Sequence, residues 1–336
     1  MDANPGSALG ANQQALINLT LRACRLADRS GAGHSRIWER FKPYFDAELR
    51  DRANGRFEFS TLVANYLPNF LYMSREWVTE KLPQIFDSDH YDLWRCAMQG
   101  YSYVRQVYPD VYEFLKVHGD FVRALDDPSL KSKVADKVIQ NIVIAYVNDF
   151  ETLDKSESLL AYLLNRAKPN EMSQLAWFVW TLRKEGDAEL TSKVLRLWDA
   201  IHERVDVSTK QGRLVASYLC KWSVFVERLD DHSMALLAKV APYSNEDHNS
   251  SELLRSLARL SESDPLRANE LWMLMLQGSL PDYPTEAITQ ILRNLWGHGD
   301  VGRAAARLSV SEYLKKGSER PAASLRELAG SEVERE

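Results

Sequence analysis

The sequence predicts an all-α protein made of stacked helical hairpins, an α-solenoid-like arrangement resembling an irregular HEAT-type or TPR-type superhelix. Apolar residues recur at helical spacing along nearly the whole chain, and no alternating strand pattern is sustained. Short breakers separate one amphipathic segment from the next, so helix–breaker–helix units recur at roughly 35 to 45 residues. A short helix with one apolar stripe needs neighbours to cover that stripe, and stacked hairpins supply them.

In the first half of the chain, breakers and capping residues divide the sequence into seven expected helices. Residues 1–10 are polar and are expected to form a flexible N-terminus. Ser35 and Ser74 can cap helices, because a serine hydroxyl accepts a hydrogen bond from a free backbone N–H. Pro43 should kink or restart its helix, since it lacks an N–H. The expected helices are Asn12–Arg29, Ser35 to about Asn54, Ser60–Met73, the segment from Ser74 past Pro83, Asp87–Val104, Pro109–Leu125 and Val134–Phe150.

The last of these segments is ambiguous, because it contains the run VIQNIVIAYV. Its β-branched content favours a strand. However, Val134, Val138, Ile142 and Ala145 step at helical spacing, and helix-forming residues flank them. A buried helix is therefore predicted.

The second half has more regular stripes and better start signals. Asp264 and Pro265 combine an N-cap carboxylate with an N1 proline, and Asp300 can cap a further helix. We expect one helical-repeat domain over residues 11–316, with a possible sub-boundary near 126–133, followed by a charged tail at 317–336 that is partly helical or frayed. The apolar stripes are Leu190–Val205, Leu214–Leu229, Leu253–Leu260, Leu271–Met275, Ile288–Trp296 and Val301–Leu308.

Composition narrows the class of protein. The chain has 336 residues, of which 45% are hydrophobic and 26% charged, with a net charge of −5 that argues against a general nucleic-acid binder. Its three cysteines are isolated, which fits small buried hydrophobic residues in a reducing cytoplasm. The N-terminus has no signal-peptide pattern, and no apolar run approaches the length of a membrane span, so no membrane partner is expected.

Motifs that carry chemistry are weak. GHGDVG at Gly297 to Gly302 matches a dinucleotide fingerprint, but a helix precedes it and Asp300 would oppose a pyrophosphate. We interpret it as a tight turn between helices. The acidic clusters at Asp87 to His90, Asp230 to His232 and Glu246 to His248 are interpreted as helix caps rather than metal sites. No P-loop, HExxH or GxSxG motif occurs, so the sequence predicts no catalytic, cofactor-binding or metal-binding residue.

Tryptophan and glycine positions carry two further expectations. Trp177 and Trp180 cannot both lie centrally on the stripe of their helix, so this helix is buried on two sides or exposes an aromatic ring. The favoured interpretation is that tryptophans fill wide gaps between crossing helices, and the alternative is an exposed binding site. Gly100 lies within an apolar helical run, where it is expected to permit a close helix contact or to end the helix.

The order of several motifs resembles a known family. EWVTEKLPQIFD (residues 76–87), AMQGYSY (97–103), LARLSESDPLRANELWMLML (257–276) and ITQILRNLWGHGD (288–300) resemble the C-terminal helical region of large bacterial sirtuin-like or STAND-type NTPase proteins of antiphage defence, as does NPGSALGANQQALINL (4–19). The resemblance covers residues 4 to 328, with Met98 and Gln84 departing from the expected tryptophan and apolar residue. It implies a sensor or scaffold tail. It implies no NAD or ATP hydrolysis, because the effector and NTPase regions have no counterpart here.

The sequence therefore leaves three alternative functions open. The first is a non-catalytic interaction or sensor module that binds a protein, either an attached or neighbouring NTPase or a phage component. The second is an enzyme whose site forms only in three dimensions. The third is a helical-repeat nucleic-acid binder with a local basic groove. If the chain begins within a longer array, an apolar edge around Leu16, Leu19 and Leu21 should also be exposed and promote self-association.

Overall fold

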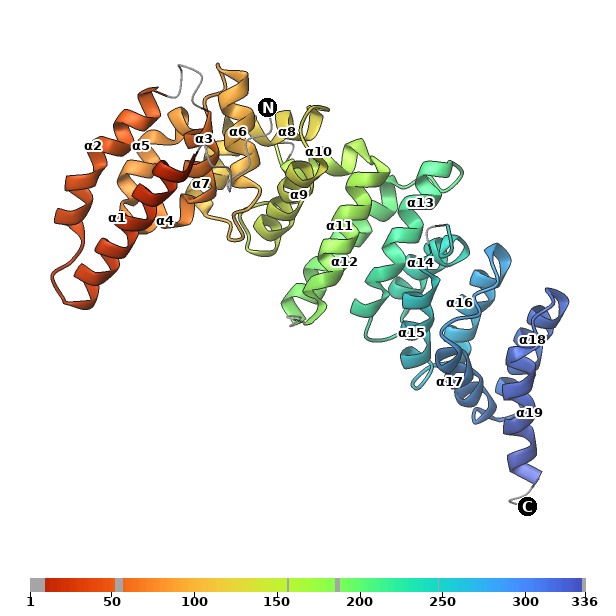
Figure 1. The fold of residues 1–336 in the computed structure, drawn as a ribbon. Helices are drawn as coiled ribbons and strands as arrows, with labels where there is room; N and C mark the ends of the chain where they lie inside the picture. Colours follow the sequence, from red (N-terminus) through yellow and green to blue (C-terminus); the bar gives the residue numbers. More distant parts are fainter. Residues whose placement is uncertain (1–9, 52–56, 156, 185–187, 247, 334–336) are drawn as a thin grey trace. The chain divides into compact units, whose positions relative to one another are not determined.

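The chain folds into α-helices joined by short connections. The computed structural model describes residues 10–51, 57–155, 157–184, 188–246 and 248–333. These ranges contain nineteen α-helices and no β-strand, which confirms the all-α prediction (Figure 1). Contacts between Cα atoms divide the chain into two compact units, Met1–Phe150 and Glu151–Glu336. The boundary proposed near 126–133 falls in the connection between two helices of the first unit.

The helices of the first unit vary in length from 7 to 19 residues and pack around an aromatic core. Trp38 and Trp77 meet edge-on at 5.5 Å between ring centroids, and the ring of Phe70 stacks on Trp77 at 5.2 Å. The elements of this unit are α1 (Ala11–Arg29), α2 (Ser35–Asp51), α3 (Glu58–Asn65), α4 (Leu67–Met73), α5 (Arg75–Ile85), α6 (Tyr91–Tyr101), α7 (Pro109–Val117), α8 (Asp120–Asp126) and α9 (Ser132–Val147).

Local sequence signals explain several of these boundaries. The Ser74 hydroxyl accepts a hydrogen bond from the Trp77 N–H at 3.2 Å, so Ser74 caps α5 as predicted. The ambiguous VIQNIVIAYV run lies within α9, where most of its apolar side chains are buried, so packing outweighs its β-propensity. Gly100 of α6 faces α3, where a Cβ atom would overlap the carbonyl oxygen of Thr61. The glycine therefore permits the close contact between α3 and α6 that the sequence suggested.

Some expected boundaries were wrong. The predicted helix over residues 60–73 is two helices, because α3 ends at Asn65 and α4 begins at Leu67, with Pro68 in its first turn. The predicted helix over 109–125 is likewise divided into α7 and α8 at Gly119. Pro43 lies inside α2, which continues through it, so of the two expected effects, a kink or a restart, the restart does not occur.

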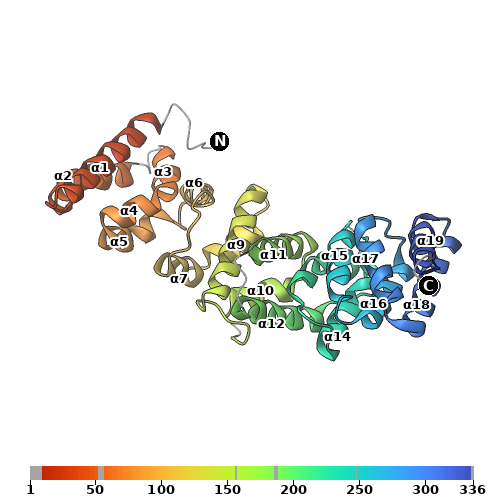
Figure 2. The same cartoon turned by 90° about the horizontal axis from the view of Figure 1, so that it is seen from below.

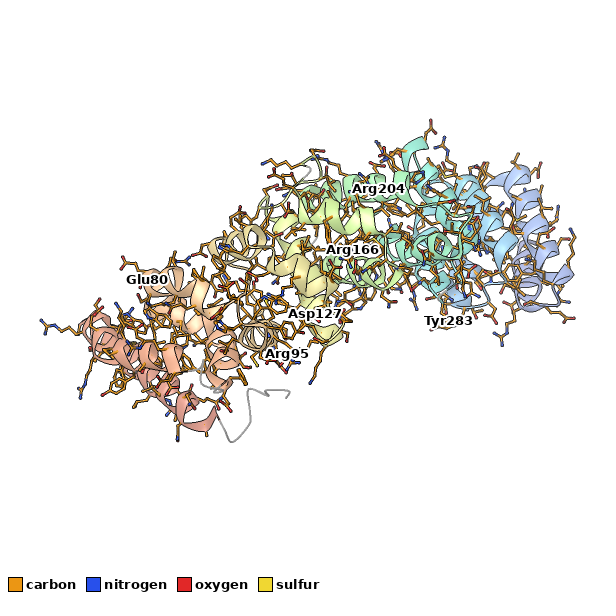
Figure 3. All side chains as sticks on the ribbon, turned by 90° about the horizontal axis from the view of Figure 1, so that it is seen from above. Glu80, Arg95, Asp127, Arg166, Arg204 and Tyr283 are labelled. Atoms are coloured by element: carbon orange, nitrogen blue, oxygen red, sulfur yellow. The ribbon has the colours of Figure 1, made fainter. Side chains whose placement is uncertain are left out.

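The second unit is longer and more regular. A salt bridge of 2.8 Å from Arg166 (labelled in Figure 3) to Glu171 joins its first two helices, and the Arg166 guanidinium also lies over the Tyr162 ring. The elements of this unit are α10 (Leu159–Arg166), α11 (Pro169–Thr181), α12 (Ala188–Arg204), α13 (Lys210–Leu219), the 3-10 helix η4 (Cys220–Phe225), α14 (Asp231–Val240), α15 (Ser250–Leu260), α16 (Pro265–Gly278), α17 (Thr285–Trp296), α18 (Gly299–Lys315) and α19 (Arg320–Val333).

Helices of the second unit form two layers. In one layer α11 contacts α13 and η4, η4 contacts α15, α15 contacts α17, and α17 contacts α19. In the other layer α10, α12, α14, α16 and α18 follow one another in the same way. Figure 2 shows α11, α15, α17 and α19 along one side of this unit and α12, α14, α16 and α18 along the other.

Side-chain hydrogen bonds repeat this arrangement at a regular sequence separation. In the first layer, Asn249 bonds Ser217, Ser223 bonds Ser256, and Asn294 bonds Ser261, at separations of 32, 33 and 33 residues. In the other layer, His232 bonds Asp199 at 33 residues and Ser309 bonds Asn269 at 40 residues. Corresponding groups in successive helices are thus 32 to 40 residues apart, close to the unit length that the sequence indicated.

Two expectations for this unit need correction and one is confirmed. The stripe from Leu214 to Leu229 is not a single helix, because α13 ends at Leu219 and a 3-10 helix follows. Asp300 does not cap α18. It lies in the first turn of that helix, whose N-cap is His298. Asp264 does cap α16, accepting from the Arg267 N–H at 3.1 Å, with Pro265 at the start of the helix.

Candidate interaction surfaces

The glycine-rich motif GHGDVG connects α17 to α18. Gly299 has φ of 73°, a left-handed conformation that favours glycine. A Cβ atom on Gly302 would overlap the carbonyl oxygen of Leu295, so this glycine allows the two helices to approach closely. The motif is therefore the tight interhelical turn that the sequence predicted.

The acidic clusters behave differently from one another. Asp230 caps α14 by accepting from the Ser233 N–H at 2.9 Å, as predicted. Asp87 does not cap α6. Its carboxylate pairs instead with the His90 ring at 3.0 Å, so that prediction was wrong. The cluster at 246–248 includes residue 247, which lies outside the described residues. Within the described ranges, no group of three or more His, Cys, Asp or Glu residues is placed to hold a metal ion.

A hollow of about 320 Å³ lies beside α12, η4 and α14. Its wall includes His232 and Ser233, which could suggest a nucleophile and a base. The Ser233 hydroxyl instead donates to the backbone oxygens of Arg228 and Asp230 at 2.8 and 3.0 Å. The His232 ring pairs with Asp199 at 2.6 Å. The Ser233 hydroxyl is thus directed to backbone oxygens rather than to the His232 ring.

The three cysteines are buried and unbridged, which confirms their interpretation as small hydrophobic residues. Burial raises the pKa of the Cys220 thiol to about 12, because the thiolate would lose its hydration. A thiol with this pKa is a poor nucleophile at neutral pH. Among the described residues, no helix combines the length and the apolar character needed to cross a membrane.

An aromatic and charged surface lies on α11, on the 3-10 helix η3 (Leu182–Lys184) that follows it, and on α15. Trp177 is 43% exposed, whereas five other tryptophans (Trp77, Trp94, Trp198, Trp222 and Trp272) are fully buried. The expectation that tryptophans fill gaps between helices is therefore wrong for Trp177, and the alternative of an exposed aromatic ring applies. We call the set Trp177, Trp180, Arg183, Glu252 and Arg255 the tryptophan surface.

Hydrogen bonds and stacking hold the tryptophan surface in place. The Trp180 indole N–H donates to Glu252 at 3.2 Å, and the Arg183 guanidinium lies 3.5 Å from the centre of the Trp180 ring. Arg255 makes a 2.5 Å salt bridge to the same Glu252 carboxylate. Side chains ordered in this way lose little conformational freedom when a partner binds.

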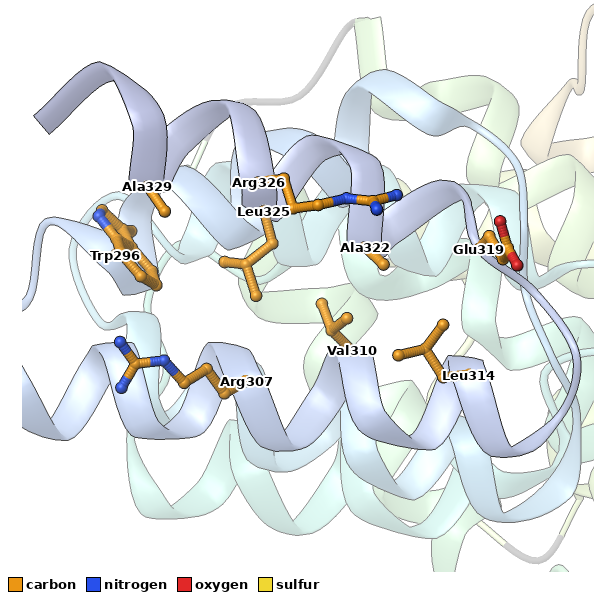
Figure 4. A pocket seen from close by; sticks show the side chains of 9 residues that line it. All are labelled: Trp296, Arg307, Val310, Leu314, Glu319, Ala322, Leu325, Arg326 and Ala329. Atoms are coloured by element: carbon orange, nitrogen blue, oxygen red, sulfur yellow. The ribbon is translucent and has the colours of Figure 1, made fainter. Parts of the chain in front are cut away.

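A second candidate surface is a groove of about 460 Å³ between α18 and α19. Figure 4 shows Val310 and Leu314 of α18 facing Ala322 and Leu325 of α19, with Trp296 at one end of the groove and Glu319 at the other. We call this the C-terminal groove. It is lined by Trp296, Arg307, Val310, Leu314, Glu319, Ala322, Leu325, Arg326 and Ala329.

The sequence does not predict the C-terminal groove, because residues 317–336 contain many charged and few large apolar residues. A weak apolar pattern is nevertheless present in the part of the sequence that forms α19. Ala322, Leu325 and Ala329 lie at positions i, i+3 and i+7 of α19, which places them on one face of a helix. Alanine contributes little to a hydrophobic pattern, so this face was not recognised.

The expected apolar edge at the first helix is present in part. Leu19 and Leu26 of α1 are 57% and 64% exposed, whereas Leu21 is buried. Arg22 and Arg25 are also exposed on this helix. The exposed edge of α1 therefore combines leucines with cationic side chains.

Comparison with known protein families, with characterised proteins and with solved structures finds no match to this chain.

Proposed function

We propose that this chain is a non-catalytic protein-interaction module, a helical-repeat scaffold of the α-solenoid type whose tryptophan surface binds a partner protein. The observation that carries the proposal is the exposure of Trp177 beside the ordered Trp180, Arg183 and Glu252. Tryptophan and arginine dominate the binding energy of many protein interfaces. An ordered pair of this kind on a helical surface is suited to protein recognition.

A protein is favoured over a nucleic acid as the partner of this surface. The chain carries a net charge of −5, and a carboxylate, Glu252, lies at the centre of the tryptophan surface. A phosphate backbone approaching Trp180 would meet this carboxylate as well as Arg183 and Arg255, and Arg255 is already paired with Glu252. A protein can present complementary charges of both signs to Glu252 and its neighbouring arginines.

The family resemblance supports a more specific role within this proposal. We propose that the chain acts in the cytoplasm as the recognition or scaffold part of a bacterial defence NTPase system, where its partner is the NTPase or a phage protein. The support is the order of motifs from residues 76–87 to 288–300. A sensor of this kind contributes binding rather than chemistry, in keeping with the engaged side chains of the hollow near Ser233.

Affinity capture followed by measurement of dissociation constants tests the proposal. Proteins crosslinked to the full chain in native cells, with and without phage, would be identified and purified. We expect Trp177→Ala to weaken binding of the captured partner by at least about tenfold, because truncating a hot-spot tryptophan costs about 2 kcal/mol.

Val117→Ser is the matched control, because Val117 is 69% exposed on α7 of the first unit. It should leave the affinity unchanged. Retention of full affinity by Trp177→Ala would remove the tryptophan surface from the proposal. Failure to recover any partner from either kind of cell would contradict an interaction module.

A further inference from the structure

The C-terminal groove has the shape of a site for a helix. Its floor is apolar, formed by Val310 and Leu314 from one helix and Leu325 from the other. Val310 is almost fully buried, but Leu314 is 49% exposed, so part of the floor is open to solvent. The small side chains Ala322 and Ala329 let another backbone approach α19 closely.

The length of the groove indicates the size of its occupant. On α18 the lining residues run from Arg307 to Leu314, and on the other wall they run from Glu319, just before α19, to Ala329. At about 1.5 Å per residue, these stretches are about 10 and 15 Å long. Two to three helical turns of a partner, about ten residues, would fill a groove of this length.

The charges on its walls indicate the chemistry of that occupant. Arg307 on α18 and Arg326 on α19 are both exposed, and neither forms an ion pair with a carboxylate in the described part of the chain. The Arg307 guanidinium lies 5.3 Å from the centre of the Trp296 ring, which holds it beside one end of the groove. Arginine in this setting offers paired N–H donors to a carboxylate.

A second copy of this chain is a poor occupant. The other exposed apolar helix face, on α1, carries Arg22 and Arg25 beside Leu19 and Leu26. Placing that face in the groove would bring these arginines toward Arg307. Pairing two grooves would place four arginines, Arg307 and Arg326 of each copy, in one interface with only Glu319 of each copy as an opposing charge in the lining.

We propose that the C-terminal groove binds an amphipathic helix of a partner protein, with apolar side chains on Val310, Leu314 and Leu325 and with Asp or Glu side chains paired to Arg307 and Arg326. Helices that lie in an apolar groove present residues at i, i+3 or i+4, and i+7. The acidic residues would flank that stripe on both sides. This site is separate from the tryptophan surface and does not depend on it.

Fluorescence anisotropy with designed peptides tests the proposal on the full chain. The probe is a labelled helical peptide with Leu at i, i+3, i+4 and i+7 and Glu on both flanks, and the matched control peptide has Lys in place of each Glu. We expect the Glu peptide to bind at least tenfold more tightly than the Lys peptide, with a difference that shrinks as salt is added.

Charge reversal at the groove identifies the binding site. In the double variant Arg307→Glu/Arg326→Glu the preference should invert, so that the Lys peptide binds more tightly. Both positions are exposed, and circular dichroism would confirm that the variant keeps its helical content. Leu314→Ser should weaken both peptides, whereas Trp177→Ala should weaken neither, which separates this site from the tryptophan surface.

Three results would overturn the proposal. The first is equal binding of the two peptides to the wild-type chain. The second is a preference for Glu that survives the double charge reversal. The third is a dimer in light scattering that Leu314→Ser converts to a monomer, since this would make a second copy the occupant.

Discussion

The first unit buries an acid and a base, Asp120 and Lys137, whereas the second unit buries two acids, Glu151 and Glu171, and otherwise serine and asparagine among its described polar residues. Asp120 and Lys137 of the first unit are 1% and 8% exposed. In the second unit, the buried Ser223 and Ser256 hydroxyls bond each other at 2.9 Å, and Asn249 bonds Ser217 at 3.0 Å. The two units thus use different polar chemistry within similar all-helical packing.

Burial disfavours the charged forms of both Asp120 and Lys137 in the first unit. The Trp94 indole N–H donates to Asp120 at 2.8 Å, but the second carboxylate oxygen is buried and accepts no hydrogen bond from a described residue. Burial raises the pKa of Asp120 to about 6. Burial also lowers the pKa of Lys137 to about 8, although its ammonium donates to the carbonyl oxygen of Arg105 at 3.3 Å.

Sequence separations close to the 32 and 33 residues of the second unit also occur in the first unit, where Trp77 bonds Asp46 at 31 residues and Lys137 bonds Arg105 at 32 residues. A buried hydroxyl is small and needs few hydrogen-bond partners, so the same pair can recur from helix to helix. A buried charge is favourable only where a partner charge or several hydrogen bonds compensate for its lost hydration. The two units therefore have similar sequence separations between bonded helices and differ in which polar groups make these bonds.

The largest expected effect concerns a feature of the backbone rather than the buried polar groups. Gly100→Ala should cost at least about 3 kcal/mol of stability, because a Cβ atom would overlap the Thr61 backbone and neither helix can yield without repacking. Hydrogen exchange of α3 and α6 measures the loss. Gly302→Ala should act similarly at Leu295 in the second unit.

Gly330→Ala on α19 is the control for these substitutions, because nothing lies within 4 Å of its added Cβ. It should stabilise the helix by about 0.5 to 1 kcal/mol. Equal losses at all three glycines would show that helix contact does not determine the cost.

The second prediction tests the buried carboxylate. Asp120 binds its proton more tightly in the folded state, since its pKa rises from 3.8 to about 6. The unfolded chain therefore loses this proton first, and stability falls as pH rises from about 4 to about 6. Asp120→Asn keeps an oxygen for Trp94 and should stabilise the chain by about 2 to 3 kcal/mol above about pH 6, with no gain below about pH 4.

Urea denaturation of wild type and Asp120→Asn across that pH range gives the difference directly. Comparing the two proteins at each pH cancels the contribution of other carboxylates, such as Asp230, whose pKa is lowered in the fold. A constant difference across the range would contradict a buried, titrating Asp120.

The third prediction tests the buried cation Lys137, whose pKa is shifted in the opposite direction from that of Asp120. The pKa of Lys137 falls from 10.5 to about 8 on folding, so its charged form is disfavoured in the folded state. Lys137→Met should therefore stabilise the chain by about 2 kcal/mol below about pH 8, and the advantage should shrink as pH rises toward 10.5. Thermal melts at several pH values measure it, and an advantage that grows with pH would reverse the inference.

The smallest effect is expected in the second unit. Ser256→Ala should cost about 1 kcal/mol at every pH, because it removes one neutral hydrogen bond to the buried Ser223. Removing both hydroxyls in Ser223→Ala/Ser256→Ala should cost little more, since no hydroxyl of the pair is then left without its partner. A stability cost of these serine substitutions that changed markedly with pH would contradict the expected difference between the two units.

Much of the fold could be predicted because helix signals are local. Asp264 with Pro265, Ser74, and the helical spacing within α9 all depend on residues less than five positions apart. The boundaries that failed depend on tertiary packing. Pro43 is accommodated within α2, and the segment after Leu219 tightens into a 3-10 helix as it packs against α11 and α15.

The candidate surfaces were harder to predict than the fold. The sequence showed that Trp177 and Trp180 cannot share one stripe, but which ring is exposed depends on how α15 packs beside α11. The C-terminal groove depends on α18 and α19 lying side by side, and its alanines give almost no hydrophobic signal. Buried Asp120 and Lys137 look like surface residues in the sequence, because their burial depends on distant helices.

The side-chain hydrogen bonds between different helices of the second unit mostly join one helix to the next in its layer. Opening one interface therefore breaks few contacts elsewhere in the unit. Stretching such a stack would separate neighbouring hairpins in succession instead of rupturing one central core. Each step would expose buried apolar side chains such as Leu257 and Ile291 and would break polar contacts such as Asn294 with Ser261 at 2.8 Å. Under a pulling force, the second unit should therefore extend in steps, as the interfaces between neighbouring hairpins open one after another.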